Sequence, residues 1–287
     1  MKQVYIRLPG LFEKFDLVKR IIELKNKYPY IFKKGYFIDS VYGSNGGTLN
    51  GGRSIKSYDK NVKDVLIFCK QYHISPMIVM NNKLTSYDLA ENDIYANLII
   101  DNVDMDDTYF CISNDDIKKW LLDKGAKINN LISSTTKCLN FEDIEEESKN
   151  YNLVVLPERF INRFDLIEKL PLCIRKKLEV IINNACPLEC TKRKDHYDYM
   201  SKLALGEKLP AFICPNCSYA GNGFLYELID TQQFVNTKKI NRYLELGINH
   251  FKIQGRTDDD YNLIETFAYY MIKDMYKIMF RELMQKQ

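Results

Sequence analysis

Short apolar runs rich in valine and isoleucine alternate with helical patterns along this chain of 287 residues. Such alternation is typical of parallel βα units, in which a helix returns the chain to the start of the next strand. Eight such runs and a final amphipathic helix predict a single α/β domain, residues 1–287, folded as a (β/α)8 TIM-like barrel. The expected strands are Val4–Leu8, Tyr36–Val41, Met77–Met80, Asn97–Ile100, Asn129–Ser133, Leu153–Leu156, Leu178–Ile182 and His250–Gln254.

Apolar faces and end signals mark the expected helices. Asp115–Lys124 follows Ser113 and Asn114, either of which can cap its first turn, and Gly125 ends it. Phe141–Ser148 starts in a similar way after an asparagine. The first helix has an apolar face made by Leu17, Val18, Ile21, Ile22 and Leu24, and one last helix has a face made by Leu263, Ile264, Phe267, Met271, Met275, Ile278 and Met279.

A doubly wound open sheet is the competing fold. The segment after the first expected strand, IRLPGLFEKF, has one glycine and no G-x-G-x-x-G pattern. The glycine-rich segment YGSNGGTLNGGR follows the second strand and lacks the lysine and the serine or threonine of a phosphate loop. A nucleotide-binding open sheet is therefore disfavoured, and we interpret the segment as a flexible loop at the top of the barrel.

Composition favours a soluble, cytoplasmic protein. No uncharged apolar segment is long enough to span a bilayer, and the first residues do not resemble a signal peptide, so no membrane association is expected. The net charge of +3 does not argue for nucleic acid as a partner. Thiols stay reduced in the cytosol, so paired cysteines there indicate metal ligands, whereas isolated ones are expected to be buried packing residues. The isolated cysteines are Cys69, Cys111, Cys138 and Cys173.

Four cysteines have the spacing of one metal centre: Cys186 and Cys190 in NNACPLEC, and Cys214 and Cys217 in ICPNC. Their segment, 184–224, interrupts the alternation of expected strands and helices. It therefore predicts a metal-binding insertion between strands seven and eight. Four thiolates can close a tetrahedral zinc site or hold an iron–sulfur cluster, and spacing alone favours structural zinc. A position after strand seven predicts a centre at the barrel mouth, where enzymes of this fold have their active sites.

Three further residues are candidates for binding a substrate. Arg53 in GGR and Arg256 in IQGR lie near expected strand ends, where arginine can grip a carboxylate or phosphate or form a rim salt bridge. His196, six residues after Cys190, is expected to face the substrate or to support the metal ligands. A hydrolase is poorly supported, because His73 and His250 lie in no nucleophile motif and a four-thiolate centre has no open position for water.

Several segments resemble the collagenase-like peptidases of family U32. LEVIINNACPLEC is similar to their strand, asparagine and cysteine segment, and HFKIQGR is similar to their K-I-x-G-R signature on strand eight. NLVVLPERF and YGSNGGTLNGGR resemble further segments, so the likeness spans the second to the eighth strand. The Cys-x3-Cys step is shorter than in better-known relatives, which marks a short, divergent member.

The resemblance implies a TIM-like barrel that holds a [4Fe–4S] cluster through Cys186, Cys190, Cys214 and Cys217, in place of zinc. Relatives of this type include hydroxylation proteins of ubiquinone biosynthesis and of RNA that work without molecular oxygen. We therefore expect an iron–sulfur enzyme that hydroxylates or otherwise modifies an RNA base or a small aromatic metabolite, with Arg53, Arg256 and His196 positioning the substrate. A peptidase-like hydrolase with a structural metal site, and a non-catalytic subunit that needs a related barrel as partner, are the alternatives.

Overall fold

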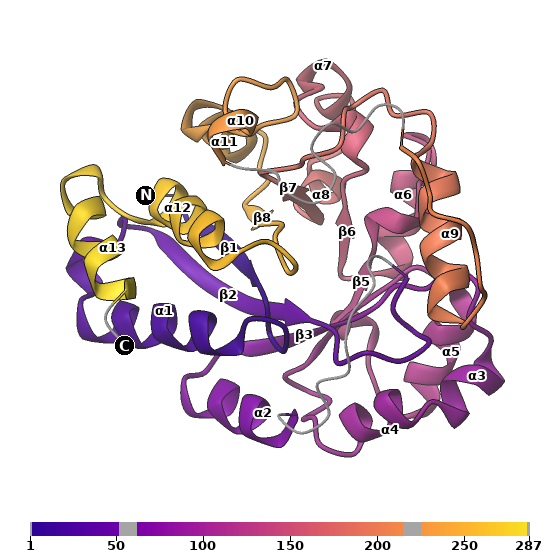
Figure 1. Ribbon diagram of the computed structural model, residues 1–287. Helices are drawn as coiled ribbons and strands as arrows, with labels where there is room; N and C mark the ends of the chain where they lie inside the picture. The colour runs from indigo at the N-terminus through magenta and orange to yellow at the C-terminus, as the bar shows by residue number, and fades with distance from the viewer. Residues whose placement is uncertain (1, 52–61, 215–224, 286–287) are drawn as a thin grey trace.

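The computed structural model describes residues 2–51, 62–214 and 225–285, and within them eight parallel strands close into a barrel in the order β1 to β8 (Figure 1). Tyr5 of the first strand pairs with His250 of the last, so the sheet has no free edge there. The predicted (β/α)8 barrel is confirmed, and the open sheet is excluded. The strands are β1 Val4–Pro9, β2 Tyr36–Gly43, β3 Ser75–Met80, β4 Tyr109–Ile112, β5 Leu131–Ser133, β6 Leu153–Val155, β7 Leu178–Ile181 and β8 His250–Lys252.

Helices surround the barrel and bury their apolar faces against it. Helix α1 buries the five residues predicted for it, and Asn114 caps α5 by accepting a hydrogen bond from the Asp116 backbone N–H. None of the described helices has the length and apolarity that a membrane crossing requires. The helices are α1 Phe15–Lys27, α2 Val62–Gln71, α3 Tyr87–Asn92, α4 Ile94–Ile100, α5 Asp115–Asp123, α6 Asp143–Asn150, α7 Phe164–Ile167, α8 Leu172–Arg175, α9 Arg193–Ala204, α10 Leu225–Leu228, α11 Thr237–Glu245, α12 Asp260–Met271 and α13 Lys277–Gln285, with 3-10 turns at Pro29–Ile31, Ile128–Asn130, Thr135–Lys137, Glu158–Phe160 and Asp274–Tyr276.

The fourth expected strand was wrong, because Asn97–Ile100 belongs to helix α4. Asp93 caps that helix by accepting hydrogen bonds from the backbone N–H groups of Tyr95 and Ala96, both at 2.9 Å. The true fourth strand is the four-residue β4, which pairs with β3 and β5. A short apolar run has no distinct period, so local capping decided the structure of this segment.

The last expected helix is two helices, α12 and α13, and not one. Between them Ile272 forms an antiparallel bridge with Phe32. Backbone hydrogen bonds join Lys33 N to Met271 O at 2.8 Å and Lys273 N to Ile31 O at 3.0 Å. The apolar stripe predicted that Met275 lies in the core. Because the chain bends between α12 and α13, Met275 instead faces solvent and is 78% exposed.

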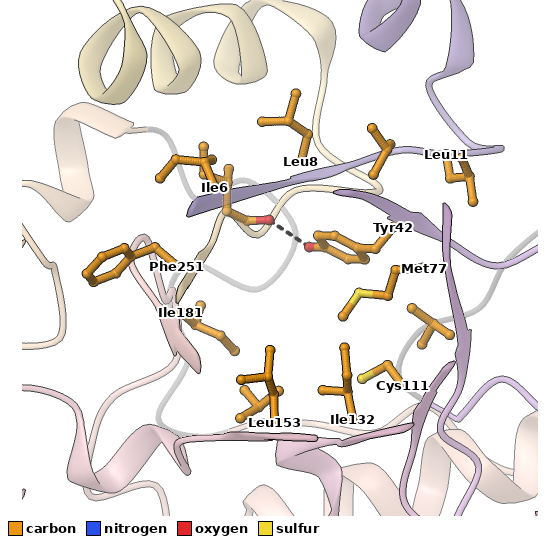
Figure 2. Packing of buried hydrophobic residues seen from close by; sticks show 14 of the residues in the cluster. Ile6, Leu8, Leu11, Tyr42, Met77, Cys111, Ile132, Leu153, Ile181 and Phe251 are labelled. Carbon is orange, nitrogen blue, oxygen red and sulfur yellow. Dashed lines mark hydrogen bonds between the residues drawn. The ribbon is translucent and has the colours of Figure 1, made fainter. Parts of the chain in front are cut away.

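Side chains of the strands alternate between the helix layer and the barrel interior (Figure 2). Ile6 and Phe251 point outward and are fully buried under the helices, whereas Tyr42 and Met77 point inward.

The barrel interior also holds a network of ion pairs. Arg7 lies 2.9 Å from Asp39 Oδ2 through Nη2 and 2.9 Å from Glu179 Oε2 through Nε, and its own side chain is 1% exposed.

Candidate functional site

A cavity of about 450 Å3 opens at the carboxyl ends of the strands. Most of its apolar side chains come from the strands, and most of its polar side chains from the segments that follow them. This is the end of the barrel where the sequence placed the site. Residues that line it include Val79, Asn81, Cys111, Ser134, Thr135, Val155, Ile181, Gln254 and Thr257.

Three of the four paired cysteines, Cys186, Cys190 and Cys214, line this cavity and are half-buried. Asn184 holds the first of them in place, because its side-chain amide donates to Cys186 O at 3.0 Å and its Oδ1 accepts from Cys186 N at 3.3 Å. The fourth, Cys217, lies outside the described residues. The predicted grouping at the barrel mouth therefore agrees with the position of three of its members, and their ligand role stays a prediction.

Thiols are the donors that zinc and iron–sulfur clusters require, so the residues on the cavity wall fit such a group in kind. Within the described ranges, which omit Cys217, no three or more Cys, His, Asp and Glu side chains come together as a metal-binding set. The described part of the site thus supplies suitable donors without completing a ligand set.

A buried carboxylate ties the cysteine segment to the barrel. Glu158, which is 1% exposed, accepts hydrogen bonds from the Tyr197 hydroxyl at 2.7 Å and from Thr135 Oγ1 at 2.6 Å. Arg193 lies 3.8 Å from the same carboxylate and donates to Pro187 O, inside the cysteine loop, at 2.6 Å. Burial, with the negative charge of Glu158 next, holds the pKa of Tyr197 well above its usual value. The Tyr197 hydroxyl is therefore a permanent donor to this carboxylate.

His196 lines the cavity, within a stack of rings on helix α9 and the segment that follows it, and its role toward a substrate stays a prediction. Its ring lies parallel to Phe212, with centroids 4.8 Å apart and planes 9° apart. Tyr199 packs against the same phenylalanine, with centroids 5.3 Å apart. This arrangement gives the mouth of the cavity an aromatic wall.

The predicted arginines have different positions. Arg256 lines the cavity, and its Nη1 lies 3.2 Å from Glu13 Oε1. Its position therefore agrees with both interpretations of this arginine, a substrate-binding residue and a partner in a rim salt bridge. Burial raises the pKa of Glu13, and the positive charge of Arg256 opposes that rise. Arg53 lies outside the described residues.

The described part of the glycine-rich loop, 43–51, is held by hydrogen bonds. Asp93 Oδ2 accepts from both the backbone N–H and the hydroxyl of Thr48 at 2.6 Å, and Gly51 N donates to Asn81 Oδ1 at 3.1 Å. Gly47 has φ of +81°, and a Cβ there would lie 2.7 Å from Asp93 Oδ1. Glycine at this position therefore lets the loop approach the cap of α4.

Sequence reasoning missed Lys252, the last residue of β8, which lines the cavity and is 7% exposed. Its Nζ lies 4.1 Å from the centroid of the Tyr42 ring. The period-two alternation of strand eight carried the signal, because it places Lys252 and Gln254 on one face of the strand, toward the interior.

The isolated cysteines differ in burial. Cys69 and Cys111 are buried as expected, and burial raises the pKa of the Cys69 thiol to about 12, which makes it inert. Cys138 is half-buried. Cys173 is exposed, which contradicts the expectation of a packing residue, because it lies on the outer face of the short helix α8.

A curated archaeal protein is similar to this chain in sequence. The chain is 24% identical over 272 residues to the uncharacterized protease MJ1657 of Methanocaldococcus jannaschii, which covers 87% of the chain and 76% of that protein. No protein-family profile matches the chain.

Two solved structures are also similar. The structure of the U32 peptidase Mk0906 has a TM-score of 0.49 and 12% identity, and covers 89% of this chain and 93% of that one. The structure of the citrate synthase SbnG has a TM-score of 0.37 and 11% identity, and covers 93% of this chain and 91% of that one. With its closed barrel and its cysteine and K-I-x-G-R segments, this chain is a TIM-barrel protein that resembles peptidase family U32.

Proposed function

We propose that this chain is an iron–sulfur enzyme of U32-like type that modifies a small aromatic metabolite or an RNA base without molecular oxygen. One observation carries the proposal: Cys186, Cys190 and Cys214 line the same cavity as His196 and Arg256. Donors for a cluster and donors for a substrate thus share one cavity at the carboxyl end of the barrel strands, where enzymes of this fold have their active sites. The hydroxylation chemistry rests on the resemblance alone.

In this proposal the four paired cysteines hold a [4Fe–4S] cluster, with Cys217 as the fourth ligand. When bound, such a cluster supplies one-electron chemistry. The chain's own residues have simpler roles. The ring stack at His196 and Phe212 offers a flat surface to a planar substrate, and Arg256 offers hydrogen-bond donors to its polar groups.

The test is metal analysis of protein purified without oxygen. We expect brown protein with roughly four irons and four sulfides per chain, the content of one cluster held by four thiolates. Replacing Cys186, Cys190, Cys214 or Cys217 by serine should remove most of the iron. Cys173→Ser is the matched control, because that cysteine is exposed on α8 and should leave the iron content unchanged. Colourless protein with one zinc per chain would contradict the proposal.

A peptidase-like hydrolase is the second candidate, because the curated relative along most of the chain carries the name of a protease. In this case the cysteines would form only a structural site. Cleavage of a peptide library that survives Cys186→Ser would favour the hydrolase. Loss of all activity unless a second, related barrel protein copurifies would instead indicate a subunit of a heteromeric enzyme.

A further inference from the structure

The deep end of the cavity contains a cation with weak partners. Lys252 lies within strand β8, between β1 and β7, so its ammonium group enters the cavity from the barrel wall and not from a loop. Its hydrogen bonds within the described residues go to two sulfur atoms, Met77 Sδ at 3.9 Å and Cys111 Sγ at 4.0 Å. Thioether and thiol sulfur are weak acceptors, whereas an ammonium group has three N–H donors to satisfy.

The nearest carboxylate does not satisfy these donors. Glu179 Oε1 lies 3.9 Å from Lys252 Nζ, which is beyond hydrogen-bond length. The other oxygen of Glu179 already lies 2.9 Å from Arg7 Nε, so one carboxylate is shared between two cations. Leaving a charged donor buried without an oxygen acceptor is costly, and a ligand oxygen in the cavity would supply the missing acceptor.

Apolar side chains from the strands form part of the cavity wall. Val79, Val155 and Ile181 line the cavity, and the Tyr42 ring lies against Lys252 Nζ. A ligand that fits such a space presents a negative charge at its deep end and an apolar, planar body behind it. A neutral RNA base offers only uncharged carbonyl oxygens, which accept weaker hydrogen bonds from an ammonium group than a carboxylate does.

We propose that Lys252 binds the carboxylate of a small aromatic carboxylic acid, which enters the cavity with that group first. This assignment rests on the proposed function, because it names the substrate class of the same cavity. Within that function it selects the small aromatic metabolite over the RNA base. His196 and its ring stack then lie along the mouth of the cavity, next to the three cysteines.

The experiment compares benzoate with its neutral isostere benzamide, by calorimetry or ligand-observed NMR, on the full chain purified without oxygen. We expect benzoate to bind at least about tenfold more tightly, as a hydrogen-bonded charge pair requires. Lys252→Met should abolish that preference and leave benzamide binding unchanged. Lys192→Met is the control, because Lys192 also lines the cavity but is solvent-exposed, and it should preserve the preference for benzoate.

Equal binding of the two probes, no binding of benzoate, or an unchanged preference in Lys252→Met would overturn the assignment. Should the methionine variant fail to fold, the wild-type comparison decides alone, and Lys252→Arg, which keeps the charge, should retain a preference for benzoate. The proposed contact of benzoate with Lys252 involves no iron atom. Protein that prefers benzoate but holds no cluster therefore contradicts the proposed function only, and clustered protein without the preference contradicts only the Lys252 site.

Discussion

The Tyr197 hydroxyl donates a hydrogen bond to Glu158 Oε1 at 2.7 Å and so joins helix α9 to the segment that follows β6. Tyr197→Phe would leave one oxygen of a buried carboxylate without this donor, at a cost of about 1–3 kcal/mol. Urea unfolding measures the change. Tyr199→Phe is the matched control, because it removes a hydroxyl from the same helix and keeps the ring that packs on Phe212, and it should cost less than about 0.5 kcal/mol. Equal losses in the two variants would mean that Glu158 does not depend on this bond.

Arg7 forms ion pairs with two carboxylates inside the barrel, those of Asp39 and Glu179. Arg7→Met removes the cation that pairs with the fully buried Glu179 and the partly buried Asp39, so we expect a loss of about 3–5 kcal/mol in the free energy of unfolding. Arg163→Met, at an exposed pair with Asp165, should change stability by less than about 1 kcal/mol. An Arg7→Met variant as stable as this control would refute the buried network.

His250 predicts a dependence of stability on pH. Burial, with the positive charge of Arg7 next, lowers its pKa below the usual 6.5, against the opposing effect of Asp39 and Glu179. The unfolded chain therefore binds a proton at a higher pH than the folded chain. The stability that the neutral imidazole contributes is present above the unfolded pKa and is lost as pH falls through the folded pKa.

The measurement is urea unfolding of wild type and His250→Phe between about pH 7.5 and about pH 5. The rings of His250 and Tyr5 are stacked, with centroids 5.1 Å apart. Phenylalanine keeps a ring at this position but does not titrate. The wild type should lose more stability over this range than the variant. Parallel pH profiles would show that His250 is not the group responsible.

Asp93 joins two parts of the molecule, the first turn of α4 and the glycine-rich loop at Thr48. Asp93→Ala should cost about 2 kcal/mol or more, because it removes a helix cap and leaves the Thr48 backbone N–H unpaired. Hydrogen exchange of residues 44–49 should accelerate. Asp88→Ala, an exposed residue in the first turn of α3, should leave that loop protected.

The barrel was predictable because most strands have a sequence signal of their own. Seven of the eight expected strands overlap the strands of the structure, which places every later element in the correct order. The fourth failed because the apolar segment at Ile94–Ile100 and the true strand Tyr109–Ile112 are alike in composition. The cap that Asp93 forms on α4 and the pairing of Tyr109–Ile112 with β3 and β5 distinguish them.

The site was predictable in place more than in detail. Cysteine spacing and the strand count placed Cys186, Cys190 and His196 at the correct end of the barrel. Lys252 was missed because the alternation of strand eight indicates the face on which it lies but not the residues that it meets there. Its partners Met77 and Glu179 come from β3 and β7, which are far away in the sequence.

The contact of Tyr5 with His250 and the bridge of Phe32 to Ile272 also govern how the chain reaches its fold. Both join segments separated by most of the sequence, and such distant contacts form slowly because a long loop must close first. During synthesis the outer edge of β1 therefore stays unpaired until residue 250 has left the ribosome. Until then the growing chain exposes a strand edge that can pair with other chains. We expect the seam between β1 and β8 to be the last part of the barrel to form, and the step at which aggregation competes with folding.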